Sequence, residues 1–207
     1  MTASAFHPVV LRHGVEIDDP VAVALGFLEA YGQYDLGARS GPAAFLEADL
    51  RHANRGGARI SAAEIASILE RRRAIERALT AIAPDASLAG AAKSVPWLPL
   101  GKLFEAFANI HGVGLAKTTK TLHPKRPALI PILDSVVQRY LESDDLGAQA
   151  PFGERALALV RGYKRDLDRN RAAVRAIKRE LARRDYRVTE VRILDLLIWS
   201  VEATRER

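Results

Sequence analysis

The sequence predicts an all-α protein, and two observations carry this prediction. Apolar residues recur at the three- and four-residue spacing of amphipathic helices along most of the 207 residues. No segment alternates apolar and polar residues between turn signals, as a half-buried strand does. With 48% apolar and 27% charged residues, the composition is that of a folded domain with a substantial core.

Helix boundaries in the first half follow from prolines and capping residues. Pro20 suits the first position of one helix, and Pro42 begins a second that runs through AAFLEADLRHA. Ser61-Ala-Ala-Glu64 is a capping box, in which the serine hydroxyl accepts from a backbone amide and the glutamate reaches back. The helix that follows is expected to continue to Pro84. Its apolar stripe consists of Ile65, Ile68, Leu69, Ile75, Leu79 and Ile82.

In the second half, a helix is expected over about 100–110, followed by His111-Gly-Val-Gly114 and a short helix to about Leu122. A proline-rich stretch, HPKRPALIP, leads to Asp134 and the helical SVVQRYLE. After a turn over 144–152, the rest of the chain is expected to be helical, because no proline occurs beyond Pro151.

The charge is unevenly distributed, and it favours a polyanionic partner. Lys and Arg number 31 against 25 Asp and Glu, a net of +6. Residues 1–114 sum to −1, 115–139 to +4, 140–160 to −3 and 161–207 to +6. Basic blocks beside a near-neutral body are typical of nucleic-acid binding, although solvated helix faces explain them equally well. On a helical wheel the C-terminal arginines lie opposite the apolar face, so there solvation is the first interpretation.

Composition excludes several kinds of chemistry. The chain has no cysteine, which rules out disulfides, thiol catalysis, and cysteine-ligated zinc or iron–sulfur clusters. Its five histidines show no metal-ligand spacing, so neither a metal nor a cofactor is expected. No apolar run approaches the roughly 20 residues that span a bilayer, and no signal peptide is recognisable. We therefore expect no membrane partner and a cytoplasmic location.

The most informative feature is the Gly112-Val113-Gly114 sequence between two helices. Glycine tolerates a positive φ, so the chain can reverse tightly there while Val113 packs between the helices. The amides at the start of the next helix then form a site for a DNA phosphate. Nearby groups that extend this predicted contact are Lys117, Thr118, Lys120, Lys125 and Arg126.

These residues resemble the helix-hairpin-helix DNA glycosylase superfamily, the group of endonuclease III. That family has a Gly-(Val/Ile)-Gly hairpin and, about twenty residues later, an aspartate followed by a hydroxyl residue. Here Asp134 lies 20 residues after Gly114, within Ile132-Leu-Asp-Ser-Val-Val-Gln-Arg139. A closer likeness, from about Tyr34 onward, is to an uncharacterised bacterial domain family of unknown function. The shared segments are the hairpin, Lys125–Asp134 and Arg192–Trp199.

The resemblance implies a fold of two helical lobes in one domain. One lobe would span 60–143, with the hairpin 111–114 and Asp134, and the other would combine 1–59 with 144–207. It also implies base excision: Asp134 would be the catalytic carboxylate that stabilises the cation-like sugar or activates water. A displaced base leaves a gap in the duplex, and the candidates to fill it are Asn54, Arg55 and Trp97.

Two positions depart from the family pattern. Bifunctional members carry a nucleophilic lysine two residues after the second glycine, where this chain has Ala116. Lys117 lies about 100° further round the helix, so any glycosylase activity should be monofunctional. The proline expected before the first glycine is His111 here.

Alternatives remain open at this point. Aspartate is a preferred N-cap, so Asp134 is equally well explained by capping alone, and Gly-Val-Gly by a plain turn. The chain is therefore a monofunctional DNA glycosylase, a non-catalytic DNA-binding module, or a helical protein-interaction domain. Asp195 and Trp199 in the last helix are expected to be cap, ion-pair or core residues.

Overall fold

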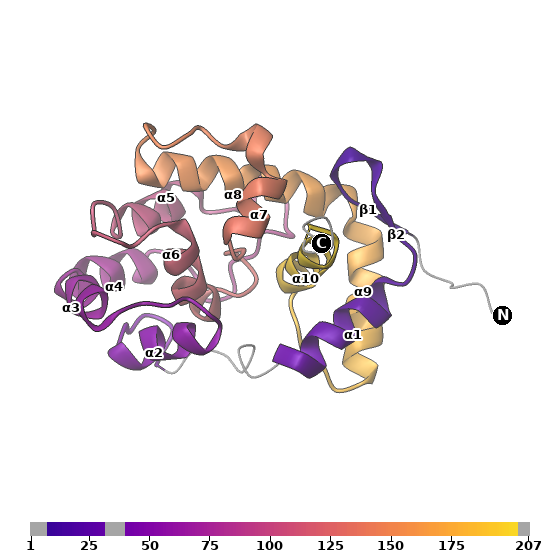
Figure 1. Cartoon of the computed structure of the whole chain (residues 1–207), viewed down its shortest axis with the longest axis horizontal. Coiled ribbons are helices and arrows are strands. Elements are labelled where there is room, and N and C mark those ends of the chain that lie inside the picture. Colours follow the sequence, from indigo (N-terminus) through magenta and orange to yellow (C-terminus); the bar gives the residue numbers. More distant parts are fainter. Residues whose placement is uncertain (1–7, 32–39, 203–207) are drawn as a thin grey trace.

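The computed structural model describes residues 8–31 and 40–202, and over these ranges the chain is largely helical (Figure 1). One feature departs from the expected all-α class. β1 (Val9–Val10) pairs antiparallel with β2 (Glu16–Ile17) in a short hairpin. Two residues per strand are too few to produce a recognisable alternation in the sequence.

The bounds of the helices are as follows. The α-helices are α1 (Pro20–Tyr31), α2 (Glu47–Arg55), α3 (Ala62–Glu70), α4 (Arg72–Thr80), α5 (Trp97–Glu105), α6 (Leu115–Leu122), α7 (Ser135–Tyr140), α8 (Phe152–Arg169), α9 (Arg171–Arg183) and α10 (Glu190–Glu202). The 3₁₀ turns are η1 (Arg12–Gly14), η3 (Ala92–Ser94), η4 (His123–Lys125) and η5 (Glu142–Asp144).

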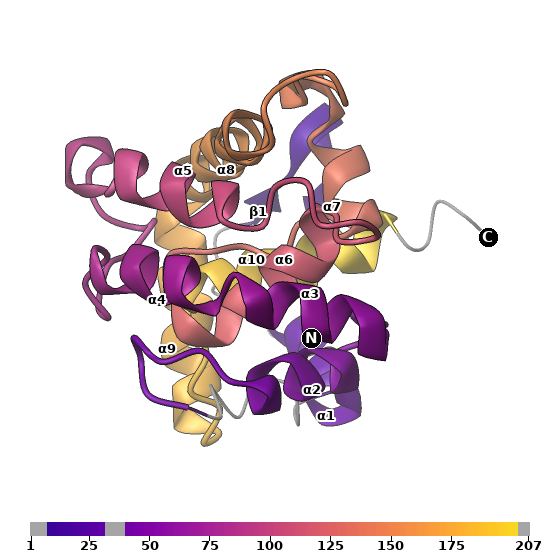
Figure 2. The same cartoon turned by 90° about the vertical axis from the view of Figure 1, so that its left-hand side faces the viewer.

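Two groups of helices lie side by side, and α8 runs between them. α2 to α6 gather on one side, and α1, α9 and α10 on the other with the β-hairpin (Figures 1 and 2). α8 packs along α5 and continues into α9, while α10 contacts α1, α7 and α9. α2 packs against α6 and α3, so it lies with the middle helices, on the other side of the lobe boundary expected at residue 60. The division into two lobes stays a prediction.

Local capping rules explain the start of α3. The hydroxyl oxygen of Ser61 accepts from the Glu64 amide at 3.3 Å, and Oε2 of Glu64 accepts from the Ser61 amide at 2.8 Å. The predicted capping box is therefore confirmed. The single helix expected from there to Pro84 is wrong, because the helix breaks at Arg71, which separates α3 from α4. No glycine or proline marks this break.

A buried arginine fixes the proline-rich segment that leads to Asp134. Arg126 is 1% exposed, and its guanidinium donates to the carbonyl oxygens of Pro42, Leu79, Ile82 and Lys125. These four bonds tie the residues before α2, the end of α4 and the chain after η4 together. Each satisfies a backbone acceptor that burial would otherwise leave without a donor.

Candidate functional site

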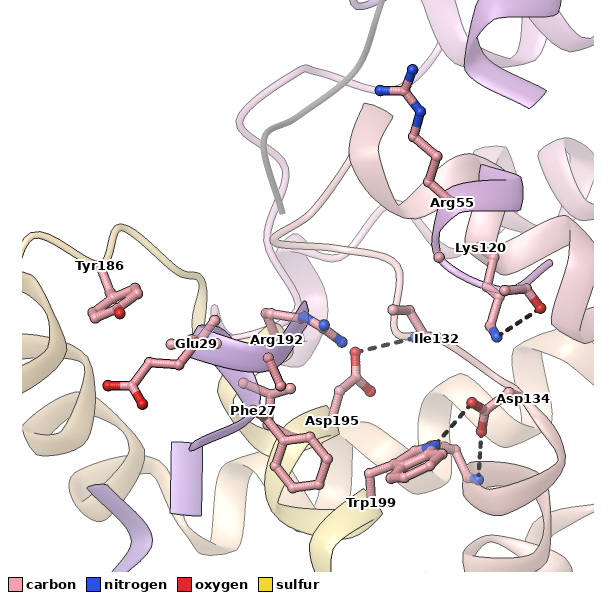
Figure 3. A pocket seen from close by; sticks show the side chains of 16 residues that line it. Phe27, Glu29, Arg55, Lys120, Ile132, Asp134, Tyr186, Arg192, Asp195 and Trp199 are labelled. Atoms are coloured by element: carbon pink, nitrogen blue, oxygen red, sulfur yellow. Dashed lines mark hydrogen bonds between the residues drawn. The ribbon is translucent and has the colours of Figure 1, made fainter. Parts of the chain in front are cut away.

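A cleft of about 750 Å³ lies between α1, α2, α6, α7 and α10 (Figure 3). This volume falls within the range of small-molecule sites. Both ionisable and aromatic side chains reach it. The lining residues are Phe27, Leu28, Glu29, Ala30, Arg55, Gly56, Gly57, Lys120, Ile132, Asp134, Val137, Tyr186, Arg192, Asp195, Leu196 and Trp199.

Asp134 lies at one side of the cleft and also caps α7. Its Oδ1 accepts from the amides of Val136 and Val137, each at 3.1 Å. Its Oδ2 accepts from the indole Nε1 of Trp199, also at 3.1 Å (Figure 3). The carboxylate is thus held in one orientation while remaining part of the cleft surface. The expected N-cap is confirmed, and it coexists with a position in a cleft.

The backbone approaching Asp134 is held from two sides. The Leu133 amide donates to Oγ1 of Thr119 on α6 at 2.9 Å. The Ile132 amide donates to Oδ2 of Asp195 on α10 at 3.3 Å. Asp195 and Trp199 are four residues apart, one helical turn, so α10 contacts this segment at two successive levels.

Asp195 is an unusual carboxyl group for this cleft. It is 3% exposed, and its Oδ1 has no hydrogen-bond partner among the described residues. Burial raises its pKa to about 8, with Arg192 acting against the shift and Asp134 adding to it. At neutral pH the protonated form therefore predominates, which places a neutral carboxyl beside the carboxylate of Asp134.

Positive charge enters the cleft from opposite sides. Lys120 reaches in from α6 and Arg192 from α10, while Arg55 extends from the end of α2 toward the rim (Figure 3). Nζ of Lys120 donates to the carbonyl oxygen of Gly57 at 3.4 Å. Burial lowers the pKa of Lys120; Asp134 opposes the shift, and the like charges of Arg192 and Arg59 add to it.

Comparison with known proteins assigns the chain at family level. A family of unknown function, DUF6308, matches residues 29–202. The chain belongs to this family. No curated protein and no solved structure matches it. All the cleft-lining residues except Phe27 and Leu28 fall within the DUF6308 region, so the cleft is built almost entirely from it.

The predicted hairpin adopts the expected backbone. Gly112 has a φ of +75°, and a side chain there would collide with Oε1 of Glu64. Val113 is 6% exposed and packs in the core, while Gly112 and Gly114 lie at the surface. Gly114 is the N-cap of α6. The hairpin lies outside the cleft lining, so the two features are separate in this DUF6308 chain.

Several residues predicted to contact DNA are placed elsewhere. Thr118 is fully buried, and Lys125 is buried with its Nζ 3.0 Å from Oδ1 of Asp49. Arg126 is the buried residue that ties the proline-rich segment described above. Lys117 is paired with Glu64 at 2.6 Å. Since the first three are inaccessible to a duplex, we remove them from the predicted contact surface.

The three predicted gap-filling residues also differ in their positions. The Asn54 side chain is bonded to the backbone of Ile60, where it closes the loop after α2. Trp97 donates to the Ala92 carbonyl oxygen at 3.0 Å and lies under Arg161, away from the cleft lining. Arg55 is exposed and lines the cleft, so it alone of the three is positioned near Asp134.

Three cleft residues were not predicted from the sequence. Trp199 is 38% exposed at the cleft, packed edge-on against Phe27, and bonded to Asp134. Asp195 and Arg192 come from the same helix face. The Arg192–Trp199 segment was noticed as a likeness between families, but its side chains looked like core and cap residues. Only the packing of α10 against α7 brings them to Asp134.

Within 8–31 and 40–202, no group of three or more acidic or histidine side chains is arranged to hold a metal ion. In the same ranges, none of the helices has the length and apolar character needed to cross a membrane.

Proposed function

We propose that the chain binds DNA and removes a base by hydrolysing an N-glycosidic bond, with Asp134 as the acting carboxylate. The observation that carries the proposal is the position of Asp134. Its carboxylate lines a cleft of about 750 Å³ at the residue that the glycosylase resemblance marks as catalytic. A carboxylate sealed inside an ion pair would not support it.

The chemistry requires negative charge near the sugar. When the base leaves, positive charge develops on the sugar ring, and a fixed carboxylate in a partly dry site stabilises it. Water then adds to the anomeric carbon, and the departing base takes up a proton. Asp134 suits this role because three N–H donors fix its orientation before any substrate arrives. The target base first leaves the stack at a cost of roughly a few kcal/mol.

The exposed hairpin supplies the second element of the proposal. The backbone of Gly112 and Gly114 lies at the surface beside the N-terminus of α6. Amides at such a position bind phosphate well. Here the hairpin would hold the DNA backbone, while Asp134 and the neighbouring cleft would receive the displaced nucleotide.

A second candidate, DNA binding without base release, is favoured by one observation. Oδ1 of Asp134 caps α7 through two amides, which is a complete structural role. For either candidate, duplex affinity should fall with salt, with a slope of roughly −0.9 per phosphate contacted.

The test counts abasic sites formed in duplex DNA that carries mixed alkylated, deaminated and oxidised bases. Glycosylase activity predicts that the wild-type protein creates abasic sites and that Asp134→Asn creates about 10²-fold fewer or none. Duplex affinity should stay equal or rise, because the substitution removes a negative charge. Asp144→Asn, at a carboxylate paired with Arg12 away from the cleft, is the matched control. Equal counts for wild type and Asp134→Asn would leave only the non-catalytic candidate.

A further inference from the structure

The cleft differs from the rest of the molecule in how its cations are balanced. Elsewhere, buried or half-buried cations lie against carboxylates that face them directly. Arg12 contacts Asp144 and Asp166 at 2.6 Å, Lys125 contacts Asp49 at 3.0 Å, and Lys164 contacts Asp168 at 2.9 Å.

In the cleft, two cations face one carboxylate that is already engaged. Lys120 and Arg192 approach from opposite sides, and Asp134 lies near both (Figure 3). The oxygens of Asp134, however, accept from three N–H groups. Asp195 adds little negative charge, because burial keeps it mostly protonated at neutral pH. Glu29 is on the rim, and its carboxylate points toward Tyr186 rather than toward Lys120 (Figure 3).

The like charges also act on one another. Burial lowers the pKa of Lys120, and Arg192 and Arg59 lower it further. Cations that repel one another in a half-buried space are stabilised by a bound anion, because a partly dry site strengthens the attraction.

We propose that Lys120 and Arg192 form a phosphate-binding subsite inside the cleft. The guanidinium offers a planar pair of donors that matches two phosphate oxygens, and the ammonium adds a point charge. The half-exposed indole of Trp199 on the neighbouring wall offers a stacking surface for a base. The ligand class is therefore a nucleotide that enters with its own phosphate.

This inference rests on the proposed function in one respect, since it takes the ligand of the cleft to be a nucleotide. It does not require Asp134 to cleave anything. The phosphate belongs either to a free nucleoside monophosphate or to a polynucleotide strand, and both present the same chemistry to Lys120 and Arg192.

The experiment uses Trp199 as a reporter. The chain has two tryptophans, so Trp97→Phe leaves Trp199 as the only indole. This protein is titrated with the four 2′-deoxynucleoside 5′-monophosphates, with the four unphosphorylated nucleosides, and with a mixed-sequence single-stranded oligonucleotide. Fluorescence reports binding at the cleft, and calorimetry gives the affinity.

We expect phosphate-bearing ligands to bind at least about tenfold more tightly than nucleosides, the loss typical of one charge-assisted hydrogen bond. Lys120→Gln and Arg192→Gln should each remove most of this preference, whereas Lys120→Arg and Arg192→Lys should keep part of it. The controls Lys102→Gln and Arg183→Gln replace surface cations outside the cleft and should change nothing. Circular dichroism and thermal melts verify that each variant is folded.

Binding by monophosphates identifies a free nucleotide as a sufficient source, and binding by the oligonucleotide alone identifies a strand. The inference is overturned if nucleosides bind as tightly as monophosphates, if no ligand perturbs Trp199, or if folded Lys120→Gln and Arg192→Gln variants bind like wild type. Asp134→Asn separates this result from the proposed function. Phosphate binding that survives in this variant without base release supports the subsite and not the enzyme, and the reverse result supports only the enzyme.

Discussion

The indole Nε1 of Trp199 donates to Oδ2 of Asp134 at 3.1 Å, across 65 residues of sequence. This bond joins α10 to the N-cap of α7, and it turns a capping residue into part of a cleft. Oδ1 carries the capping bonds and Oδ2 faces the indole, so the two oxygens have separate roles. The geometry of the candidate site therefore depends on α10 as much as on the segment that contains Asp134.

Removing this bond while keeping an aromatic ring tests its role. Trp199→Phe should lower the free energy of unfolding by about 1 kcal/mol, the usual worth of one hydrogen bond. The α7 cap should persist, because Oδ1 keeps both amides. Trp97→Phe is a matched control, since it also loses one indole bond, to the Ala92 carbonyl. We expect similar losses in urea denaturation for the two variants, but reduced base release for Trp199→Phe alone. Equal release by both would mean that the indole does not position Asp134.

The hairpin glycines should respond differently to alanine. Gly112→Ala forces a side chain into the left-handed region and against Glu64, so we expect a loss of about 1–2 kcal/mol or more. At Gly114 the φ is −93° and an added Cβ meets no atom within 4 Å, so Gly114→Ala should cost a few tenths of a kcal/mol. Denaturant titration of both variants measures the difference. Equal stability would contradict the backbone described for Gly112.

Arg126 distinguishes the surface expected from the sequence from the core seen in the structure. Arg126→Lys cannot reach all four carbonyl oxygens, and it leaves buried acceptors without donors. The free energy of unfolding should therefore fall by about 3 kcal/mol or more. Arg51→Lys, at an exposed ion pair with Glu47, should stay within about 0.5 kcal/mol of wild type. A stable Arg126→Lys protein that has lost duplex affinity would instead restore the predicted DNA contact.

The Asp195 carboxyl predicts a pH dependence of stability. Its pKa is about 8 in the folded chain, raised from an ordinary value of 3.8 by burial, while Arg192, Asp134 and Tyr163 also act on it. Because the folded state binds this proton more tightly than the unfolded state, its contribution is complete below about pH 4 and is lost as pH rises toward 8. The loss is at most about 1.4 kcal/mol per pH unit.

Asp195→Asn has no such proton to lose and can still accept from the Ile132 amide. Its stability relative to wild type should therefore increase between pH 5 and pH 8, as measured by urea denaturation at several pH values. Asp185→Asn, at an exposed residue, is the control and should show no such trend. A difference between Asp195→Asn and wild type that is constant with pH would rule out a raised pKa.

Local rules predicted those parts of the fold that depend on neighbouring residues. The Ser61–Glu64 capping box and the Asp134 N-cap involve groups within three residues of each other, and both are present. The break at Arg71 and the hairpin of β1 and β2 were missed, because neither carries a strong sequence signal. Each is decided by the packing of distant segments.

The candidate site was predicted only in part, for a related reason. Asp134 was singled out by spacing, but Arg192, Asp195 and Trp199 reach it only through the packing of α10. Charge misled the analysis in the opposite direction. Lys125 and Arg126 look like surface cations in the sequence, whereas carboxylate and carbonyl partners from residues 42–82 allow them to be buried.

The most direct test of the central claim is to identify the free bases released from duplex DNA of mixed damage by mass spectrometry. Wild-type protein and Asp134→Asn are compared under the same conditions, without choosing a lesion in advance. We predict that at least one base accumulates with wild type and falls to background with Asp134→Asn. Identical base profiles for the two proteins would contradict a catalytic role for Asp134.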